Sequence, residues 1–293
     1  MRFGITELFC QIDDFCKSFE PNLNKKLIAQ AKSSRNRAAS ISLSELMTIA
    51  VLFHQLRFRQ FKAFYCNHLK PYLFREFPNL PSYNRCVELL PRCLMALFAF
   101  FQTLKGACTG ISFIDSTKLA VCHNRRIPQH QVFKDSATRG KGSLGWFFGF
   151  KLHLVINHLG DIINFKLTQG NVDDREPLDE LCRSLYGILC GDRGYVGAPL
   201  KRKLASQNIQ LLTPIKKNMK RVIWTPFERY LLQHRSLIET VNDQLKNLCQ
   251  VEHTRHRSMT GLLVNLMSGL VAYCLSPNKP KLKITRDYLP KTV

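Results

Sequence analysis

A helix predicted between residues 235 and 248 separates charged from apolar side chains. At about 100° per residue, one stripe of that helix carries Arg235, Glu239, Asp243 and Lys246. A second stripe, which would face a core, carries Ile238, Val241, Leu245 and Leu248. A carboxylate between two cations suits a metal ion and a phosphodiester, but a solvated amphipathic helix shows the same pattern. Acids elsewhere in the chain must decide between these readings.

Two such acids lie in or after predicted strands. Asp115 interrupts the apolar run FIDSTKLAV, where a lone carboxylate is costly unless it is paired, hydrogen-bonded or bound to a metal. Asp192 follows the strand YGILC between Gly191 and Gly194, which permit a tight turn and a close approach to a ligand. Ligands of open α/β sheets gather beyond the carboxyl ends of strands. The alternatives are that Lys118 or a backbone amide satisfies Asp115, and that Asp192 is a plain turn residue.

The elements that would position these acids follow from the local patterns. Strands are predicted over 111–121, 144–156 and 161–168, with a hairpin turn at Gly160-Asp161. A helix over 176–185, a strand over 186–190, a helix over 198–206 and a strand over 209–213 come next, before the helix of residues 235–248. This order, β-β-β-α-β-α-β-α, predicts an α/β (α+β mixed sheet) domain that resembles the ribonuclease-H-like fold.

Residues 1–108 have a helical pattern. Ser42 and Glu45 form a predicted capping box before the apolar run LMTIAVLFHQL, and Ser82 precedes a helix expected to bend near Pro91. Short basic helices broken by turns are compatible with a helix-turn-helix or with a small helical bundle. The predicted domains are a helical DNA-binding region (1–108), a catalytic domain (109–276) and a basic tail (277–293).

Three motifs together resemble the DDE transposases of bacterial insertion sequences, relatives in fold of retroviral integrases. They are FIDSTKLAV around Asp115, CGDRGY around Asp192, and R-x3-E-x6-K formed by Arg235, Glu239 and Lys246. The resemblance covers roughly residues 110–275. The family often has a Tyr three residues before the Arg, and this chain has Leu232 there. That departure concerns fine positioning rather than the metal chemistry.

The resemblance implies a DNA transposase with two Mg²⁺ ions, which Mn²⁺ could replace, held by Asp115, Asp192 and Glu239. It implies water attack at the ends of an insertion sequence and attack of the released 3′-hydroxyl on target DNA. The partners would be double-stranded terminal inverted repeats, target DNA, and further copies of the chain in a homodimer or larger synaptic complex. Phosphate contacts are predicted for Arg235, Lys246, Lys118, Arg193, His253 and Arg255.

The charge balance agrees with a polyanionic partner. The 293 residues contain 43 Lys and Arg against 21 Asp and Glu, which gives a formal net charge of +22. Nucleic acid is the first candidate, and an anionic membrane surface is the second. No stretch is expected to be long and apolar enough to span a bilayer, and the run GLLVNLMSGLVAYCL suits a buried helix. The 11 cysteines, without a C-x-x-C pair, indicate reduced thiols in a cytoplasmic, nucleoid-associated protein.

Other interpretations stay open at this point. A ribonuclease-H-like nuclease without strand transfer would have the same acids, and an inactive DNA-binding protein would have the same charge. Asp173 and Asp174 are expected to cap the helix that contains Pro177. Basic segments, among them 134–142, are expected to follow DNA phosphates. Trp146, in an apolar strand, is expected to be a core residue rather than a stacking platform for a base.

Overall fold

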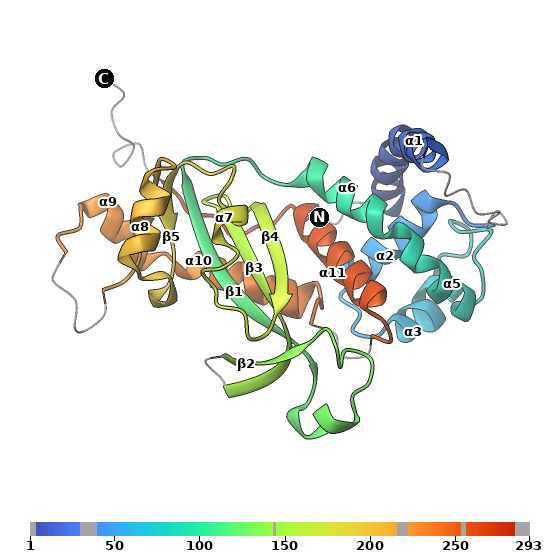
Figure 1. Cartoon of the computed structure of the whole chain (residues 1–293). Coiled ribbons are helices and arrows are strands. Elements are labelled where there is room, and N and C mark those ends of the chain that lie inside the picture. Colours follow the sequence, from blue (N-terminus) through green and yellow to red (C-terminus); the bar gives the residue numbers. More distant parts are fainter. Residues whose placement is uncertain (1–3, 30–39, 143–144, 216–221, 253–255, 285–293) are drawn as a thin grey trace. The chain divides into compact units, whose positions relative to one another are not determined.

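The chain forms two compact units (Figure 1). The computed structural model describes residues 4–29, 40–142, 145–215, 222–252 and 256–284, and only the backbone of 22–29. The first unit contains residues 1–104 and 245–277, and the second contains residues 105–244 and 278–293. The first unit is therefore built from two separate stretches of sequence. Residues 245–276, predicted as part of the catalytic domain, belong to this first unit.

The first unit is helical in its described part. It contains α1 (Ile5–Ala29), α2 (Leu43–Gln55), α3 (Phe61–Phe64), α4 (Lys70–Tyr72), α5 (Tyr83–Leu89), α6 (Leu94–Leu104) and α11 (Met259–Cys274), with a π-helix, η1 (Tyr65–Leu69), and a 3-10 turn, η2 (Leu90–Cys93). The capping box of Ser42 and Glu45 is present at α2, and the Ser82 side chain caps α5, both as predicted. Pro91 lies in η2, which interrupts the helical stretch where a bend was expected.

Helix α11 is buried along most of its length, as expected for the apolar run near the C-terminus. The segment Tyr83–Leu104 is long and apolar enough to cross a membrane by length and composition. The expectation that no stretch would pass that test was therefore wrong. A core helix passes the same test, and four residues of α6 are buried: Ala96, Leu97, Phe100 and Phe101.

The second unit is built on a mixed six-stranded sheet. Its strands are β1 (Ile111–Cys122), β2 (Thr138–Gly142), β3 (Gly145–Asn157), β4 (Ile162–Gln169), β5 (Gly187–Cys190) and β6 (Ile209–Leu212). The strand order is β2-β3-β1-β5-β6, and β4 also pairs with β3. Antiparallel β1, β3 and β4 are followed by parallel β5 and β6. This is the mixed α/β arrangement predicted from the sequence.

Helices pack against both faces of this sheet. Side chains of α7 (Leu178–Leu181) and α8 (Ala198–Ala205) share a buried cluster with Ile114, Val155 and Tyr195. Helix α10 (Ser236–Asp243) contacts β1 and buries Ile238 and Val241. It continues into a π-helix, η5 (Gln244–Leu248), and is preceded by α9 (Pro226–Gln233).

The β3–β4 hairpin has the turn that the sequence predicts. Gly160 adopts φ +77° and donates its backbone N–H to the Asn157 carbonyl over 3.1 Å. The Asn157 side-chain oxygen accepts backbone N–H groups from Leu159 and Asp161 over 3.0 and 2.9 Å. An amide side chain therefore satisfies the turn from inside, which explains why Asn157 is buried at the end of β3.

Three elements of the second unit differ from the prediction. Strand β2 falls in the basic segment 134–142, whose glycines and cations lack apolar alternation. The helix expected over 176–185 is only α7, four residues long, because the chain turns again at Cys182. Helix α9 was missed, although Thr225 and Glu228 form a capping box with Pro226 between them.

All eleven cysteines are free thiols. Most are buried, and desolvation raises the pKa of Cys86, Cys182 and Cys190 to about 12. These thiols stay protonated and act as small apolar core residues.

Candidate active site

The parallel pairing of β1 with β5 brings two of the predicted acids together. Phe113 pairs with Cys190 in that register. Asp115, within β1, and Asp192, just after β5, each come two residues beyond that pair, so both lie where the paired stretch of the two strands ends. Neighbouring strands are about 4.8 Å apart. The two acids, 77 positions apart in sequence, thereby become neighbours.

Asp115 is partly shielded from solvent and has a specific neutral partner. Asn242, a buried residue of α10, donates its side-chain N–H to Asp115 Oδ2 over 3.1 Å. The backbone N–H of Ser116 also favours the charged form. Burial outweighs these hydrogen bonds and raises the pKa of Asp115 to about 7, with a further upward contribution from Asp192 and Glu239. The Arg235 guanidinium acts in the opposite direction.

Asp192 is held by the turn that follows β5. Its Oδ1 accepts the backbone N–H of Gly194 over 2.7 Å, at the start of η4 (Arg193–Tyr195). The ring of Tyr195 is buried in the core below. A Cβ on Gly191 would lie 3.0 Å from that ring, so glycine is needed for the strand to pass so closely. The CGDRGY motif therefore both directs the carboxylate and anchors the turn.

Glu239 projects from the solvent-facing stripe of α10. Its side chain is 52% exposed, and its Oε1 accepts a hydrogen bond from Arg235 over 2.8 Å. Ile238 and Val241 face the core, as the helical periodicity predicts. Because Asp115 senses the charges of Asp192, Glu239 and Arg235, the second unit brings all four side chains into one electrostatic neighbourhood.

The remaining predicted phosphate contacts are more dispersed. Lys118 lies on β1 opposite Lys151 of β3, and Arg193 is exposed in η4. Lys246 belongs to the first unit, where it forms a salt bridge with Glu252 over 3.2 Å. His253 and Arg255 lie outside the described residues.

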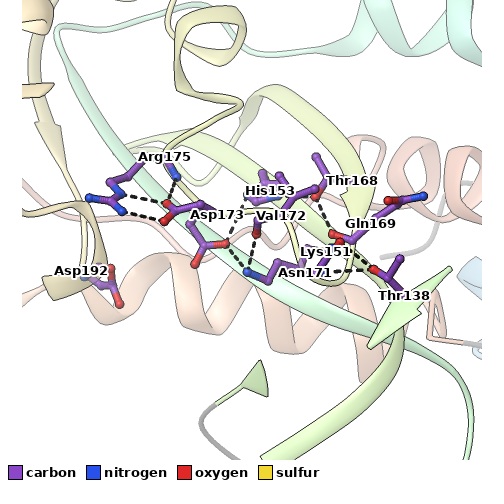
Figure 2. Close-up of polar contacts among 12 residues, drawn as sticks. Thr138, Lys151, His153, Thr168, Gln169, Asn171, Val172, Asp173, Arg175 and Asp192 are labelled. Atoms are coloured by element: carbon purple, nitrogen blue, oxygen red, sulfur yellow. Dashed lines mark hydrogen bonds and ion pairs between the residues drawn. The ribbon is translucent and has the colours of Figure 1, made fainter. Parts of the chain in front are cut away.

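Sequence reasoning missed a polar cluster beside the site, which Figure 2 shows. Lys151 donates to Asp174 over 2.9 Å and to the Val172 carbonyl over 2.8 Å. His153, fully buried, contacts Thr168 Oγ1 through Nε2 over 2.8 Å. Burial lowers the pKa of His153 to about 4. The sequence could have indicated this cluster, since Lys151 and His153 are two residues apart in a strand and therefore lie on the same face of β3.

The expected capping role of Asp173 and Asp174 was wrong. Helix α7 has Pro177 at its N-cap and no side-chain cap. Asp173 instead accepts the backbone and side-chain N–H groups of Arg175 over 2.7 to 2.9 Å (Figure 2), and these bonds hold its pKa well below the usual range. The loop after β4 is therefore built from ion pairs rather than from a helix start.

A second missed residue is Asn242. It lies three residues after Glu239, so the helical repeat already places both in adjacent turns of α10. Its side-chain oxygen is buried and has no hydrogen-bond partner among the residues that the structure describes. The signal that could have found it is a polar residue directly next to the apolar stripe of the helix.

No three acidic, imidazole or thiol side chains among the described residues are gathered closely enough to hold one metal ion. The donor chemistry nevertheless fits a divalent cation. Carboxylate and amide oxygens are hard ligands, and Asp115 is a desolvated acid whose nearest acidic neighbours further destabilise its charge. A cation bound between Asp115 and the neighbouring acids would offset both the desolvation of Asp115 and the repulsion among the carboxylates.

Asp115 inside β1, Asp192 just after β5 and Glu239 on the flanking helix α10 share one electrostatic neighbourhood, an arrangement that suits an enzyme of the nucleotidyl-transferase and endonuclease class. The family model described as Transposase DDE domain matches residues 105–259, just over half of the chain. The chain belongs to this transposase family, whose substrate is DNA and whose members generally use divalent metals. No curated protein matches the chain.

Proposed function

We propose that this transposase cleaves the ends of an insertion sequence and joins the released 3′-hydroxyl to target DNA. The observation that carries the proposal is the shared neighbourhood of Asp115, Asp192 and Glu239, reached from three separate elements. Two Mg²⁺ ions, or Mn²⁺ in their place, would stabilise the attacking and leaving oxygens of the phosphodiester. Asp115, Asp192 and Glu239 would hold these ions.

Each protein group has a separate task in this proposal. Asn242 fixes Oδ2 of Asp115 and leaves the other carboxylate oxygen available for a cation. Arg235, now paired with Glu239, exchanges that partner for a phosphate oxygen when DNA and metal arrive. Lys246, Lys118, Arg193, His253 and Arg255 contribute phosphate contacts. A homodimer or larger complex of the chain would hold two inverted repeats at once.

The test uses purified protein, DNA with a candidate terminal inverted repeat, and Mg²⁺. The wild type should nick the repeat end and then join it to a second duplex. Asp115→Asn should lose both products and retain nearly normal DNA affinity. Retained nicking by Asp115→Asn would refute the assignment of the acids. Nicking without joining by the wild type would favour the alternative, a nuclease without strand transfer.

A further inference from the structure

One end of the second unit carries cations around an exposed tryptophan. Arg125 and Arg126 belong to the 3-10 helix η3 (Asn124–Gln129), Arg139 and Lys141 to β2, and Trp146 to β3. These five residues are called the η3–hairpin surface below. Figure 1 shows β2 and the segment around η3 together at one end of the sheet. Asn124 joins the two parts, because its side-chain N–H donates to the Trp146 carbonyl over 2.8 Å.

Trp146 does not lie in the core, and the expectation that it would was wrong. Its side chain is 62% exposed, whereas the next two residues of β3, Phe147 and Phe148, are buried. Lys141, its partner in the β2–β3 register, has its ammonium 6.0 Å from the ring centroid. Tryptophan is highly buried on average, so an exposed indole among cations calls for an explanation.

The cations of this surface differ from the ion-paired cations of the same unit. All four are exposed, and none forms a salt bridge within the part of the chain that the structure describes. Three other cations of the unit are paired with acids: Lys166 with Glu180, Lys203 with Asp179, and Arg175 with Asp173. The positive field of the η3–hairpin surface is thus directed toward solvent.

We propose that the η3–hairpin surface binds DNA, with its cations on phosphates and Trp146 stacked against an unpaired base. This rests on the proposed function, which supplies the DNA. Unneutralised arginine and lysine take up backbone phosphates regardless of sequence. An indole face binds any base by stacking, but only a base that has left the helix offers its face. The combination selects nucleic acid over an acidic protein, which offers no base to stack.

The first experiment uses the tryptophan fluorescence of the full chain. The chain has two tryptophans, so Trp224→Phe leaves Trp146 as the sole fluorophore. The variant is titrated in EDTA, where no cleavage occurs, with a duplex and with the same duplex carrying one unpaired base. The unpaired base should quench Trp146 more strongly, and Trp146→Ala should weaken binding of that DNA by about tenfold relative to the duplex. Equal quenching by both DNAs, or by polyglutamate, would overturn the stacking role.

The second experiment measures the salt dependence of DNA affinity. Arg139→Gln with Lys141→Gln removes two unpaired cations and should reduce the slope of log affinity against log salt by about 2. Lys166→Gln with Lys203→Gln removes the same charge from paired positions and should leave the slope nearly unchanged. Equal slopes for the two double variants would overturn the phosphate contacts. Neither experiment requires cleavage. A negative result in either one would therefore overturn the surface proposal alone, whereas retained nicking by Asp115→Asn would overturn the proposed function.

Discussion

Two acidic regions of the second unit are neutralised differently. In the loop after β4, Asp173 and Asp174 each have a cation of their own, Arg175 and Lys151. Around Asp115, two further acids face a single arginine, and burial, with a smaller contribution from those acids, raises the pKa of Asp115 to about 7. The presence of acidic residues in a segment of sequence therefore does not distinguish a structural loop from a candidate metal centre. What distinguishes them is whether the protein supplies the counter-charge.

The largest effect expected from this contrast is on catalysis. Asp115→Asn should lower DNA cleavage by at least about a thousandfold, because it removes a carboxylate from the uncompensated region. Asp173→Asn, in the compensated loop, should leave cleavage within about threefold of wild type. Initial rates on repeat-end DNA in Mg²⁺ measure both. Comparable losses in the two variants would remove the distinction between the regions.

The buried histidine beside the compensated loop should give stability a pH dependence. The folded-state pKa of His153, about 4, lies below its ordinary value of 6.5, so the unfolded chain binds the proton more readily between these values. This contribution is complete above pH 6.5 and is lost as the pH falls, by about 1.4 kcal/mol per pH unit. Urea unfolding at pH 7 and pH 5 should show a smaller difference for His153→Gln than for wild type. If the stability difference between pH 7 and pH 5 were the same for wild type and His153→Gln, the pKa of His153 would not be lowered by burial.

Breaking the counter-charge in the compensated loop should destabilise the fold. Lys151→Met leaves Asp174 and the Val172 carbonyl without their shared donor, at a cost of about 2 kcal/mol once the partial exposure of Asp174 is considered. Adding Asp174→Asn should restore part of the loss, since the isolated charge is then removed. Chemical denaturation of the two variants measures this. A double variant less stable than Lys151→Met would show that the charge pair is not the cause.

The smallest effect concerns the neutral partner of Asp115. Asn242→Leu should slow cleavage by about tenfold and raise the Mg²⁺ concentration for half-maximal rate, because one oxygen of Asp115 loses its fixed position. Thr240→Ala, on the exposed side of the same helix, serves as a control and should change neither quantity. Unaltered Mg²⁺ dependence in Asn242→Leu would mean that Asp115 needs no such support.

Much of the second unit could be predicted from short-range patterns. Apolar runs and turn residues predicted β1, β3, β4, β5 and β6, and two of the acids selected by motif, Asp115 and Asp192, lie on neighbouring strands or just beyond them. Strand β2 could not be found in this way, because its residues show no apolar alternation and it forms only by pairing with β3. The outward orientation of Trp146 likewise depends on which side of β3 remains uncovered, and strand periodicity alone does not specify that.

Side-chain partners were the least predictable level. Asp173 and Asp174 satisfy every local requirement for a helix cap, but the next helix begins only after Pro177, and Lys151 reaches Asp174 from a strand more than twenty residues away. Asn242 was overlooked for the same reason, since its partner is 127 residues distant. Local sequence restricts what a polar residue can do, while the tertiary contact determines what it does.

The two-part composition of the helical unit sets an order on its folding. Helix α11 contributes twelve buried residues to that unit and packs against α2 and α6, yet it is translated after the whole sheet. The apolar faces of α2 and α6 that α11 later covers therefore stay exposed while more than 150 further residues are translated. A truncated product ending near residue 244 would keep that face permanently open, and such a product would be prone to aggregate or to be degraded.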